Sequence, residues 1–406
     1  MERISGEIDR GDRTLRLTRS RALKMARSTH AYVRGNTAKF YEWLAKSRSA
    51  EHLPQGPSCW ICGDAHLGNL GPIAAADGQI DIQIRDLDQS VIGNPAHDLI
   101  RLGLSLASAA RGSDLPGVTT ARMIEEMVDG YARAMAQGED GETPEPNVVK
   151  AVKRQALGRR WRHLLSRMDD SNAGLPRGKK FWPLEPAEDK ALKTLFKDPA
   201  VIAMVLALNR RDEGDRVRLL DAAFWKKGCS SLGNLRYAAL LGIGGSRKQP
   251  ADYALIDLKE AVTAVAPSSD PAAMPQDHAQ RVVAGAMALA PNLGERMLAT
   301  HVLGRSVMMR ELLPQDLKLE VAQFSQGQAT KAARYLAYVV GLAHARQMDR
   351  EARRWWQDAV RRRQSATLDA PGWLWESVVD LTGIHEAAYL EHCRAYALSA
   401  SEAQTG

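Results

Sequence analysis

Apolar side chains recur with helical spacing near both ends of the chain. The pattern covers residues 20–47, with a break at Gly35, and returns over residues 95–137 and again over residues 329–397. Side chains three and four positions apart share one face of a helix, so this period indicates amphipathic helices that pack on a core. The pattern therefore predicts two mainly helical regions that flank the middle of the chain.

Segments with the length and period of β-strands lie between and within these regions. Residues 59–62 (CWIC) form a short apolar run, and residues 79–84 (QIDIQI) alternate polar and apolar side chains. Further along, residues 228–241, 253–258 and 306–310 have strand character, with a glycine-rich turn between the first two. Alternation with period two is typical of half-buried strands. Together, helices and strands predict an α+β fold.

The segment between the first helical region and these later strands is harder to interpret. Residues 138–186 are rich in Gly, Pro and charge, and they enclose a basic helical pattern at 147–168. We interpret this stretch as an insertion or a substrate-facing element. Helices are expected to resume and to continue to about Trp225, and another helix is expected at about 276–290.

Length and composition describe an ordinary globular protein. The chain has 406 residues, of which 45% are hydrophobic and 25% charged, enough for two or three domain-sized units. It contains no apolar run of the roughly 18 residues that span a bilayer, and no apolar stretch near its beginning suits a signal peptide. We therefore expect a cytoplasmic protein without a membrane partner. Four cysteines are too few for a disulfide framework in a chain of this length.

The net charge of +7 raises the possibility of a nucleic-acid partner. The basic residues alternate with acidic ones along most helical stretches, which is typical of solvated faces. Local clusters occur at residues 159–162 (RRWR) and 361–363 (RRR), and we also interpret both as solvated helix faces. A nucleic-acid-binding protein with coincidental motifs remains an alternative that we do not favour.

The most informative motif is the loop Gly63 to Asn69 (GDAHLGN), followed after a strand by Asp86. Transfer of a phosphoryl group from ATP needs a carboxylate that orients the acceptor hydroxyl, and oxygen ligands for the magnesium that bridges the phosphates. Asp64 can serve as that carboxylate, and Asn69 and Asp86 offer the hard oxygen ligands that Mg²⁺ prefers. Asp88 could be a further metal ligand or a solvated carboxylate.

Three blocks in this part of the chain resemble the kinase-like small-molecule phosphotransferases, which include aminoglycoside and choline kinases. They are residues 62–69 (CGDAHLGN), residues 85–86 (RD) and residues 93–99 (GNPAHDL). The resemblance implies ATP and Mg²⁺ as ligands, Asp64 at the acceptor hydroxyl, and an acceptor whose identity the sequence leaves open. Asp98 is expected to cap or anchor the next helix, and His66 to brace the loop.

The nucleotide-binding parts that such enzymes place before the catalytic loop appear after it in this chain. The small-residue turn from Gly228 to Arg236 could bring backbone N–H groups close to phosphate oxygens. Lys259, at the end of a strand, would contact the ATP phosphates, and the strand at 306–310 would lead to the hinge that meets adenine. The expected nucleotide-binding residues are Gly228, Ser230, Ser231, Gly233, Arg236, Lys259, Glu311 and Leu312.

Nearly the whole chain also resembles the bacterial family catalogued as domain of unknown function 2252. The blocks that carry this resemblance include residues 32–35 (YVRG), 257–261 (DLKEA), 310–312 (REL) and 343–346 (AHAR). The family is grouped with protein-kinase-like folds. The resemblance implies a bilobal, circularly permuted kinase-like fold. In it, residues 226–318 form a small nucleotide lobe, and residues 1–225 and 319–406 together form the helical lobe.

One position departs from this pattern. Active kinases pair the ATP-binding lysine with a Glu on the following helix, and this chain has Ala284 where that Glu is expected. Either another acid substitutes, or Lys259 is loosely held and the protein is a nucleotide-binding pseudokinase. Transfer of AMP instead of a phosphoryl group also stays open. We expect His344 to be a buried, hydrogen-bonded core histidine.

A zinc or redox site at Cys59 and Cys62 is a further alternative that we do not favour. A structural zinc site needs four ligands, and no second pair with ligand spacing follows. A redox pair of this spacing usually opens a helix, whereas here a glycine loop follows. Both cysteines are expected to act as small apolar residues of a strand.

Overall fold

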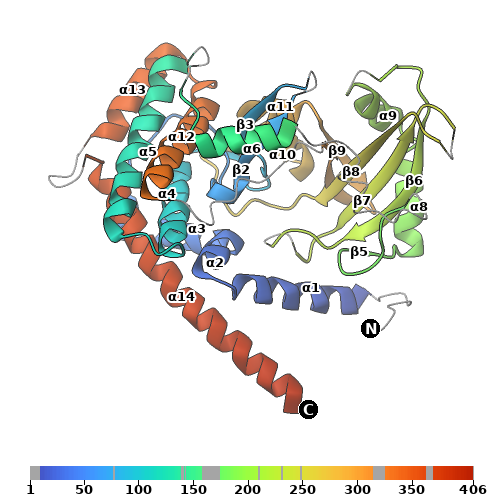
Figure 1. The fold of residues 1–406 in the computed structure, drawn as a ribbon, viewed down its shortest axis with the longest axis horizontal. Coiled ribbons are helices and arrows are strands. Elements are labelled where there is room, and N and C mark those ends of the chain that lie inside the picture. Colours follow the sequence, from blue (N-terminus) through green and yellow to red (C-terminus); the bar gives the residue numbers. More distant parts are fainter. Residues whose placement is uncertain are drawn as a thin grey trace.

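Helices gather at one end of the molecule and an antiparallel sheet at the other (Figure 1). This is a mixed α/β architecture, as the sequence predicts. The computed structural model describes residues 10–75, 78–138, 141, 143–157, 174–208, 211–229, 232–246, 249–313, 325–362 and 369–405.

The helical end is built from segments far apart in the sequence. Its helices are α4 (Ala96–Arg111), α5 (Gly117–Gln137), α12 (Gln326–Ala345), α13 (Arg350–Arg361) and the long α14 (Gly372–Thr405). Helices α5 and α12 pack closely because glycines face the contact: a Cβ on Gly130 would lie 2.0 Å from the backbone oxygen of Arg334. The predicted helical regions at 95–137 and 329–397 thus form one body.

Three short helices precede this body, in the region where the sequence predicts helices with a break at Gly35. They are α1 (Arg10–Met25), α2 (Thr29–Gly35) and α3 (Thr37–Lys46), followed by the 3₁₀ helix η1 (Arg48–His52). Asn36 accounts for the break, because its side chain accepts a hydrogen bond from the Lys39 N–H and so caps α3. The predicted break is confirmed.

Two small two-stranded sheets lie between the helical body and the large sheet. Strand β1 (Cys59–Ile61) pairs with β4 (Val91–Gly93), and β2 (Leu70–Ala74) pairs with β3 (Ile80–Ile84), both antiparallel. The 3₁₀ helix η2 (Leu67–Asn69) precedes β2, and α6 (Asn147–Leu157) packs near this hairpin. The predicted strand at 79–84 and the buried cysteine-bearing strand at 59–62 are therefore present.

Among the described residues, six strands form the large sheet in the order β5-β6-β7-β8-β10-β9. Helices α8 (Pro186–Leu195) and α9 (Pro199–Leu206) pack on one face, and α10 (His278–Leu289) and α11 (Pro291–Gly294) follow β8. The short 3₁₀ helix η4 spans Pro271–Ala273. The strands are β5 (Phe181–Trp182), β6 (Val217–Trp225), β7 (Arg236–Ile243), β8 (Asp252–Glu260), β9 (Met297–Val302) and β10 (Arg305–Leu312).

The sequence-based expectation of helices up to Trp225 is wrong, because residues 217–225 form the strand β6. The segment reads VRLLDAAFW and lacks a clean polar–apolar alternation. In the structure Phe224 packs in the core beneath α8 and α9, whereas Ala223 and Trp225 pack in a separate apolar cluster on the opposite face. A strand that is covered on both faces loses the period that would identify it.

Helix α1 joins the two ends of the molecule (Figure 1). Near its beginning, Arg13 forms a buried ion pair with Glu188 of α8, at 2.9 Å between Nη1 and Oε1. Just past its last residue, the Ala26 carbonyl accepts a hydrogen bond from the Tyr389 hydroxyl of α14. No helix among the described residues is long and apolar enough to cross a membrane.

Replacing Arg13 with Met should lower the free energy of unfolding by about 3 kcal/mol, because the change leaves the fully buried Glu188 carboxylate without its cation. Chemical denaturation measures the loss. The control is Lys193→Met, which breaks the exposed pair with Asp189 and should cost less than about 0.5 kcal/mol. Equal losses in the two variants would show that the buried pair does not hold α1 in place.

Candidate functional site

The buried carboxylate of Asp98 holds the start of the loop from Gly63 to Asn69. The Asp98 side chain accepts hydrogen bonds from the backbone N–H groups of Cys62 (2.7 Å) and Gly63 (2.9 Å). Gly63 has φ of +69°, and a Cβ there would lie 2.2 Å from the backbone oxygen of Gln89, so only glycine fits. Asp98 therefore fixes the start of the loop.

His344 completes this anchor from the opposite helix. Its Nε2 lies 3.1 Å from the Asp98 carboxylate and its Nδ1 lies 3.0 Å from the Tyr131 hydroxyl, and its side chain is fully buried. The expectation of a buried, hydrogen-bonded core histidine is confirmed. Asp98 is an anchor rather than a helix cap, because the Asn94 side chain accepts the hydrogen bond from the Ala96 N–H at the start of α4.

Asp64 and Asn69 lie side by side at the two ends of the loop. The Asn69 Nδ2 donates to the Asp64 carbonyl at 3.0 Å, so the Asn69 amide oxygen takes no part in this hydrogen bond. The Asp64 Oδ1 accepts from Nε of the fully buried Arg101 at 2.8 Å. Burial raises the pKa of Asp64, and Arg101 opposes the rise only in part. Its second carboxylate oxygen is not taken by Arg101.

His66 lies next to Asp64 but does not pair with it closely. Its Nε2 is 3.9 Å from the Asp64 carboxylate, and its ring is buried. Burial first, and then the charges of Arg34 and Arg101, hold the pKa of His66 well below its usual value, so the ring is neutral near pH 7. The bracing that the sequence predicts comes from its backbone, because the His66 carbonyl accepts from the Asn69 N–H at 2.8 Å.

Lys259 brings the large sheet into contact with the loop that follows β3. Its Nζ lies 3.2 Å from the Asp86 carboxylate and also pairs with Asp88, and the lysine is almost fully buried. Burial alone would raise the pKa of Asp86, but the charge of Lys259 outweighs it and holds the pKa well below its usual value. Burial and the neighbouring Asp86 raise the pKa of Asp88 to about 6.

The helix after Lys259 fixes this contact without supplying an acid of its own. Ala284 stands on α10, where it offers no carboxylate, and Asp88 supplies one instead. From the same helix, the buried Arg281 donates to the backbone oxygens of Asp88, at 2.9 Å, and of Ser90. The helix therefore holds the backbone of the loop whose acids hold Lys259.

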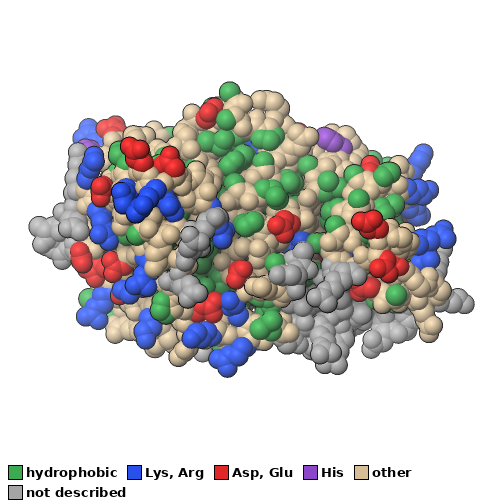
Figure 2. Space-filling view, turned by 90° about the horizontal axis from the view of Figure 1, so that it is seen from above, with side chains coloured by type: hydrophobic (Ala, Val, Ile, Leu, Met, Phe, Trp, Pro, Cys, Tyr) green, Lys and Arg blue, Asp and Glu red, His purple; other side chains and the backbone are tan. Residues whose placement is uncertain are grey.

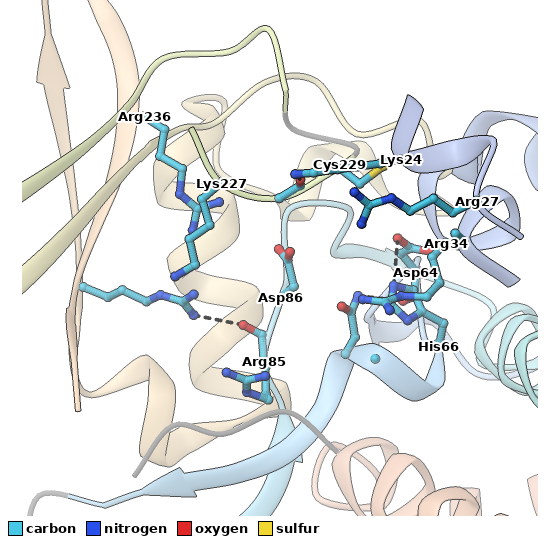
Figure 3. A pocket seen from close by; sticks show the side chains of 15 residues that line it. Lys24, Arg27, Arg34, Asp64, His66, Arg85, Asp86, Lys227, Cys229 and Arg236 are labelled. Carbon is cyan, nitrogen blue, oxygen red and sulfur yellow. Dashed lines mark hydrogen bonds and ion pairs between the residues drawn. The ribbon is translucent and has the colours of Figure 1, made fainter. Parts of the chain in front are cut away.

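A cavity of about 420 Å³ opens beside these acids (Figure 3). Asp64, Asn69 and Asp86 line this cavity, and Arg85 lies next to Asp86. Two further groups of basic side chains line its opposite sides. The helix-side cations are Lys24, Arg27 and Arg34, and the sheet-side cations are Lys227, Arg236 and Arg310. The lining thus carries far more positive than negative charge and suits a polyanion.

One buried carboxylate offsets part of the charge of the sheet-side cations. Asp257 accepts two hydrogen bonds from Arg236, at 2.8 and 2.6 Å, and lies 3.6 Å from Arg310 and 3.8 Å from Lys227. Burial opposes ionisation, but these cations outweigh it and hold the pKa of Asp257 well below its usual value. Burial lowers the pKa of Lys227 well below its usual value. Even without the charge of Lys227, the two arginines outnumber this one carboxylate, so a positive excess remains.

A second cavity, of about 270 Å³, lies on the other side of the same acids. It shares Asp64, Asn69 and Asp86 with the first cavity, and Asp88 and Glu260 add acidic side chains to its lining. The three shared side chains therefore form a partition between a cationic cavity and a more acidic one. A chemical group transferred from a ligand in one cavity to a ligand in the other would pass between these three side chains.

The structure gathers most of the expected site residues but not all of them. Gly228 and Arg236 line the first cavity, whereas Ser230 and Ser231 lie outside the described residues. Gly233 has φ of +115° and stands in open space. The described residues that line the two cavities do not include Gly233, Lys259, Glu311 or Leu312.

Glu311 and Leu312 are engaged within the sheet end of the molecule. The Glu311 carboxylate is fully buried and forms a two-pronged ion pair with Arg211, at 2.7 and 2.8 Å. Leu312 pairs with Leu255 of β8 in the sheet. The structure therefore gives the Glu311 side chain a partner other than a bound ligand.

Sequence reasoning missed most of the basic lining. Lys24 and Arg27 stand on the last turn of α1 and just after it, and Lys227 lies two residues past the end of β6. A possible signal was the spacing of Lys24 and Arg27, which are three positions apart and so share one side of a helix. Arg34 and Arg310 lie within blocks that carried the family resemblance, but no role was assigned to them.

Comparison with known proteins gives one match. A model of domain of unknown function 2252, described as an uncharacterized protein conserved in bacteria, matches residues 13–395. No curated protein and no solved structure matches the chain. The match covers most of the chain, so it includes both the Gly63–Asn69 loop and Lys259.

The neutral His66 makes the protein sensitive to acid. Its pKa is lower in the folded state than in the unfolded chain, where it is about 6.5. The unfolded chain therefore binds a proton first, and stability falls as the pH drops below about 6.5. Replacing His66 with Gln should reduce this slope by up to about 1.4 kcal/mol per pH unit. Denaturation curves between pH 7.5 and 5 measure it.

The control for this experiment is His52→Gln at an exposed position, which should leave the slope unchanged. If His66→Gln and the unmodified chain have the same acid dependence, His66 does not stay neutral in the folded protein.

Proposed function

We propose that this chain, which belongs to the bacterial family domain of unknown function 2252, transfers a phosphoryl group from ATP to an acceptor hydroxyl with the help of Mg²⁺. The observation that carries the proposal is the contact between Lys259 and Asp86, at 3.2 Å, beside Asp64 and Asn69. Phosphoryl transfer needs a cation at the phosphates, oxygen ligands for magnesium and a carboxylate at the acceptor, and these residues provide each of them.

The proposed architecture is a bilobal kinase-like fold with a circularly permuted chain. The small lobe would contain the large sheet, from β5 to β10, and so would begin before residue 226, since β5 and β6 pair into that sheet. Helices from both flanks of the chain would form the second lobe. The close packing of α12 on α5 supports this, because it brings the late helical segment beside the early one.

The residues present fit a magnesium ion. Asn69 donates through Nδ2 to the Asp64 carbonyl, so its amide oxygen is the atom left to coordinate, and the Asp86 carboxylate is 41% exposed at the cavity. Among the described residues, no three His, Cys, Asp or Glu side chains form a metal cluster, and Mg²⁺ with ATP needs only one or two carboxylates because phosphates complete its shell. The ion would bridge the phosphates and neutralise part of their charge.

In the proposed reaction the residues of the chain position two reactants. Lys259 and the sheet-side cations hold the ATP phosphates, and the Gly228 turn lies against them. The oxygen of the Asp64 carboxylate that Arg101 does not contact accepts a hydrogen bond from the acceptor hydroxyl. The hydroxyl oxygen forms a bond to the γ-phosphorus as the bond to the β,γ-bridging oxygen breaks. ADP leaves, and the hydroxyl proton passes to Asp64, whose raised pKa suits it to accept a proton.

An active enzyme is favoured over a pseudokinase by the surroundings of Lys259. The sequence has Ala284 where an acid partner of Lys259 is expected. In the structure, Asp88 and Asp86 both pair with Lys259. The products separate phosphoryl transfer from AMP transfer: the first releases ADP and the second releases pyrophosphate.

Replacing Asp86 with Asn should abolish the Mg²⁺-dependent part of ATP binding and lower turnover at least 100-fold, because magnesium loses its carboxylate ligand. Replacing Asp64 with Asn should lower turnover similarly and leave MgATP binding nearly intact, since Asp64 acts on the acceptor. Thermal-shift titrations with ATP, with and without Mg²⁺, measure binding, and ADP release in the presence of acceptor candidates measures turnover.

The control is Asp81→Asn, an exposed carboxylate near the same hairpin, which should change neither quantity. If ATP stabilises the protein without turnover in any acceptor mixture, the pseudokinase reading holds. If ATP and Mg²⁺ do not shift the melting temperature of the unmodified chain, the proposed function is wrong.

A further inference from the structure

The helix-side cations lie on the acceptor side of the proposed reaction centre. In Figure 3, Arg27 and Arg34 stand with Asp64 and His66 on one side of the cavity, Arg236 and Lys227 stand on the other, and Asp86 lies between them. Phosphoryl donor and acceptor approach roughly in line from opposite sides of the transferred group. A triphosphate held at the sheet side therefore places the acceptor beside the helix-side cations.

Arg34, on helix α2, packs against the loop that carries Asp64. Its guanidinium lies against Gly68, where a Cβ would come within 2.6 Å of the guanidinium carbon. Glycine at this position thus leaves the space that Arg34 occupies. Its buried Nε has no hydrogen-bond partner among the described residues, and the same residues provide no ion-pair partner for Arg34. A guanidinium in this position can bind a ligand group that the described residues do not supply.

The two other helix-side cations, Arg27 and Lys24, differ in the contacts that they make. The exposed Arg27 has no ion-pair partner among the described side chains, whereas Lys24 donates to the Gly228 carbonyl at 2.5 Å. Burial lowers the pKa of Lys24. Lys24 therefore links α1 to the Gly228 turn, and the two arginines are the groups available to a ligand.

The basic lining is not an extension of a continuous basic surface on the face seen in Figure 2. On that face Lys and Arg side chains gather toward the two ends of the molecule with Asp and Glu among them, and apolar side chains occupy much of the middle. A general attraction for nucleic acid would place its cations along an open face. Cations on opposite walls of one cavity of about 420 Å³ instead fit a small polyanion.

We propose that the acceptor is a small phosphorylated compound, a phosphomonoester with a free hydroxyl, whose phosphate is bound by Arg34 and Arg27. This inference rests on the proposed function, since it assigns the substrate class of the same site. Arginine presents two parallel N–H donors to a phosphate, which fixes both position and orientation. With the phosphate held over Gly68, the hydroxyl of such a compound reaches the Asp64 oxygen that Arg101 does not contact.

Calorimetric titration of inorganic phosphate tests this inference on the full chain saturated with Mg²⁺ and a non-hydrolysable ATP analogue. Phosphate should bind to the loaded protein. Arg34→Gln should weaken this binding at least ten-fold and leave the affinity for the nucleotide analogue within two-fold. Gly68→Ala should weaken phosphate binding similarly with no change in charge, because the new methyl group displaces the Arg34 guanidinium.

Arg354→Gln, on the exposed surface of α13, is the control for loss of one positive charge and should leave phosphate binding within two-fold. The inference is overturned if phosphate does not bind the loaded protein, or if Arg34→Gln weakens the nucleotide analogue as much as it weakens phosphate. Either result leaves the proposed function standing. Failure of the nucleotide analogue to bind at the loading step overturns the proposed function and this inference together.

Discussion

The structure depends on the buried ammonium of Lys259 and the two carboxylates that hold it. A charged amine removed from water is costly unless partners surround it, and Asp86 and Asp88 are the partners that this fold provides. Lysine and acids belong to elements 173 residues apart in the chain. Their pairing therefore links the large sheet to the loop that follows β3.

The buried carboxylate of Asp98 positions the part of the site that contains Asp64. Asp98 holds the backbone of the loop that carries Asp64, and His344 from the late helix α12 holds Asp98. Arg101 then fixes one oxygen of Asp64, and Asp64 itself lines the cavity. Each catalytic candidate is thus positioned by a buried polar contact rather than by the loop alone, which keeps its geometry fixed before any ligand binds.

Local sequence signals located the acidic half of the site, because Asp64, Asn69 and Asp86 lie in one loop and at the end of one hairpin. Lys259 could also be located, since a strand with clear period precedes it. The basic half could not be located. Lys24, Arg27 and Lys227 come from the end of a helix and from connecting segments, and only the tertiary fold brings them to one cavity. The strand β6 was mistaken for helix because both of its faces are covered. The expectation for Glu311 did not anticipate its ion pair with Arg211, a residue 100 positions earlier.

The most direct test of the central claim is a crystal structure of the chain with Mg²⁺ and a non-hydrolysable ATP analogue. The account predicts the triphosphate between Lys259 and the Gly228 turn, with the metal bound by Asp86 and Asn69 and the γ-phosphate facing Asp64. A nucleotide bound elsewhere, with the contacts of Lys259 to Asp86 and Asp88 unchanged and the cationic cavity empty, would contradict it.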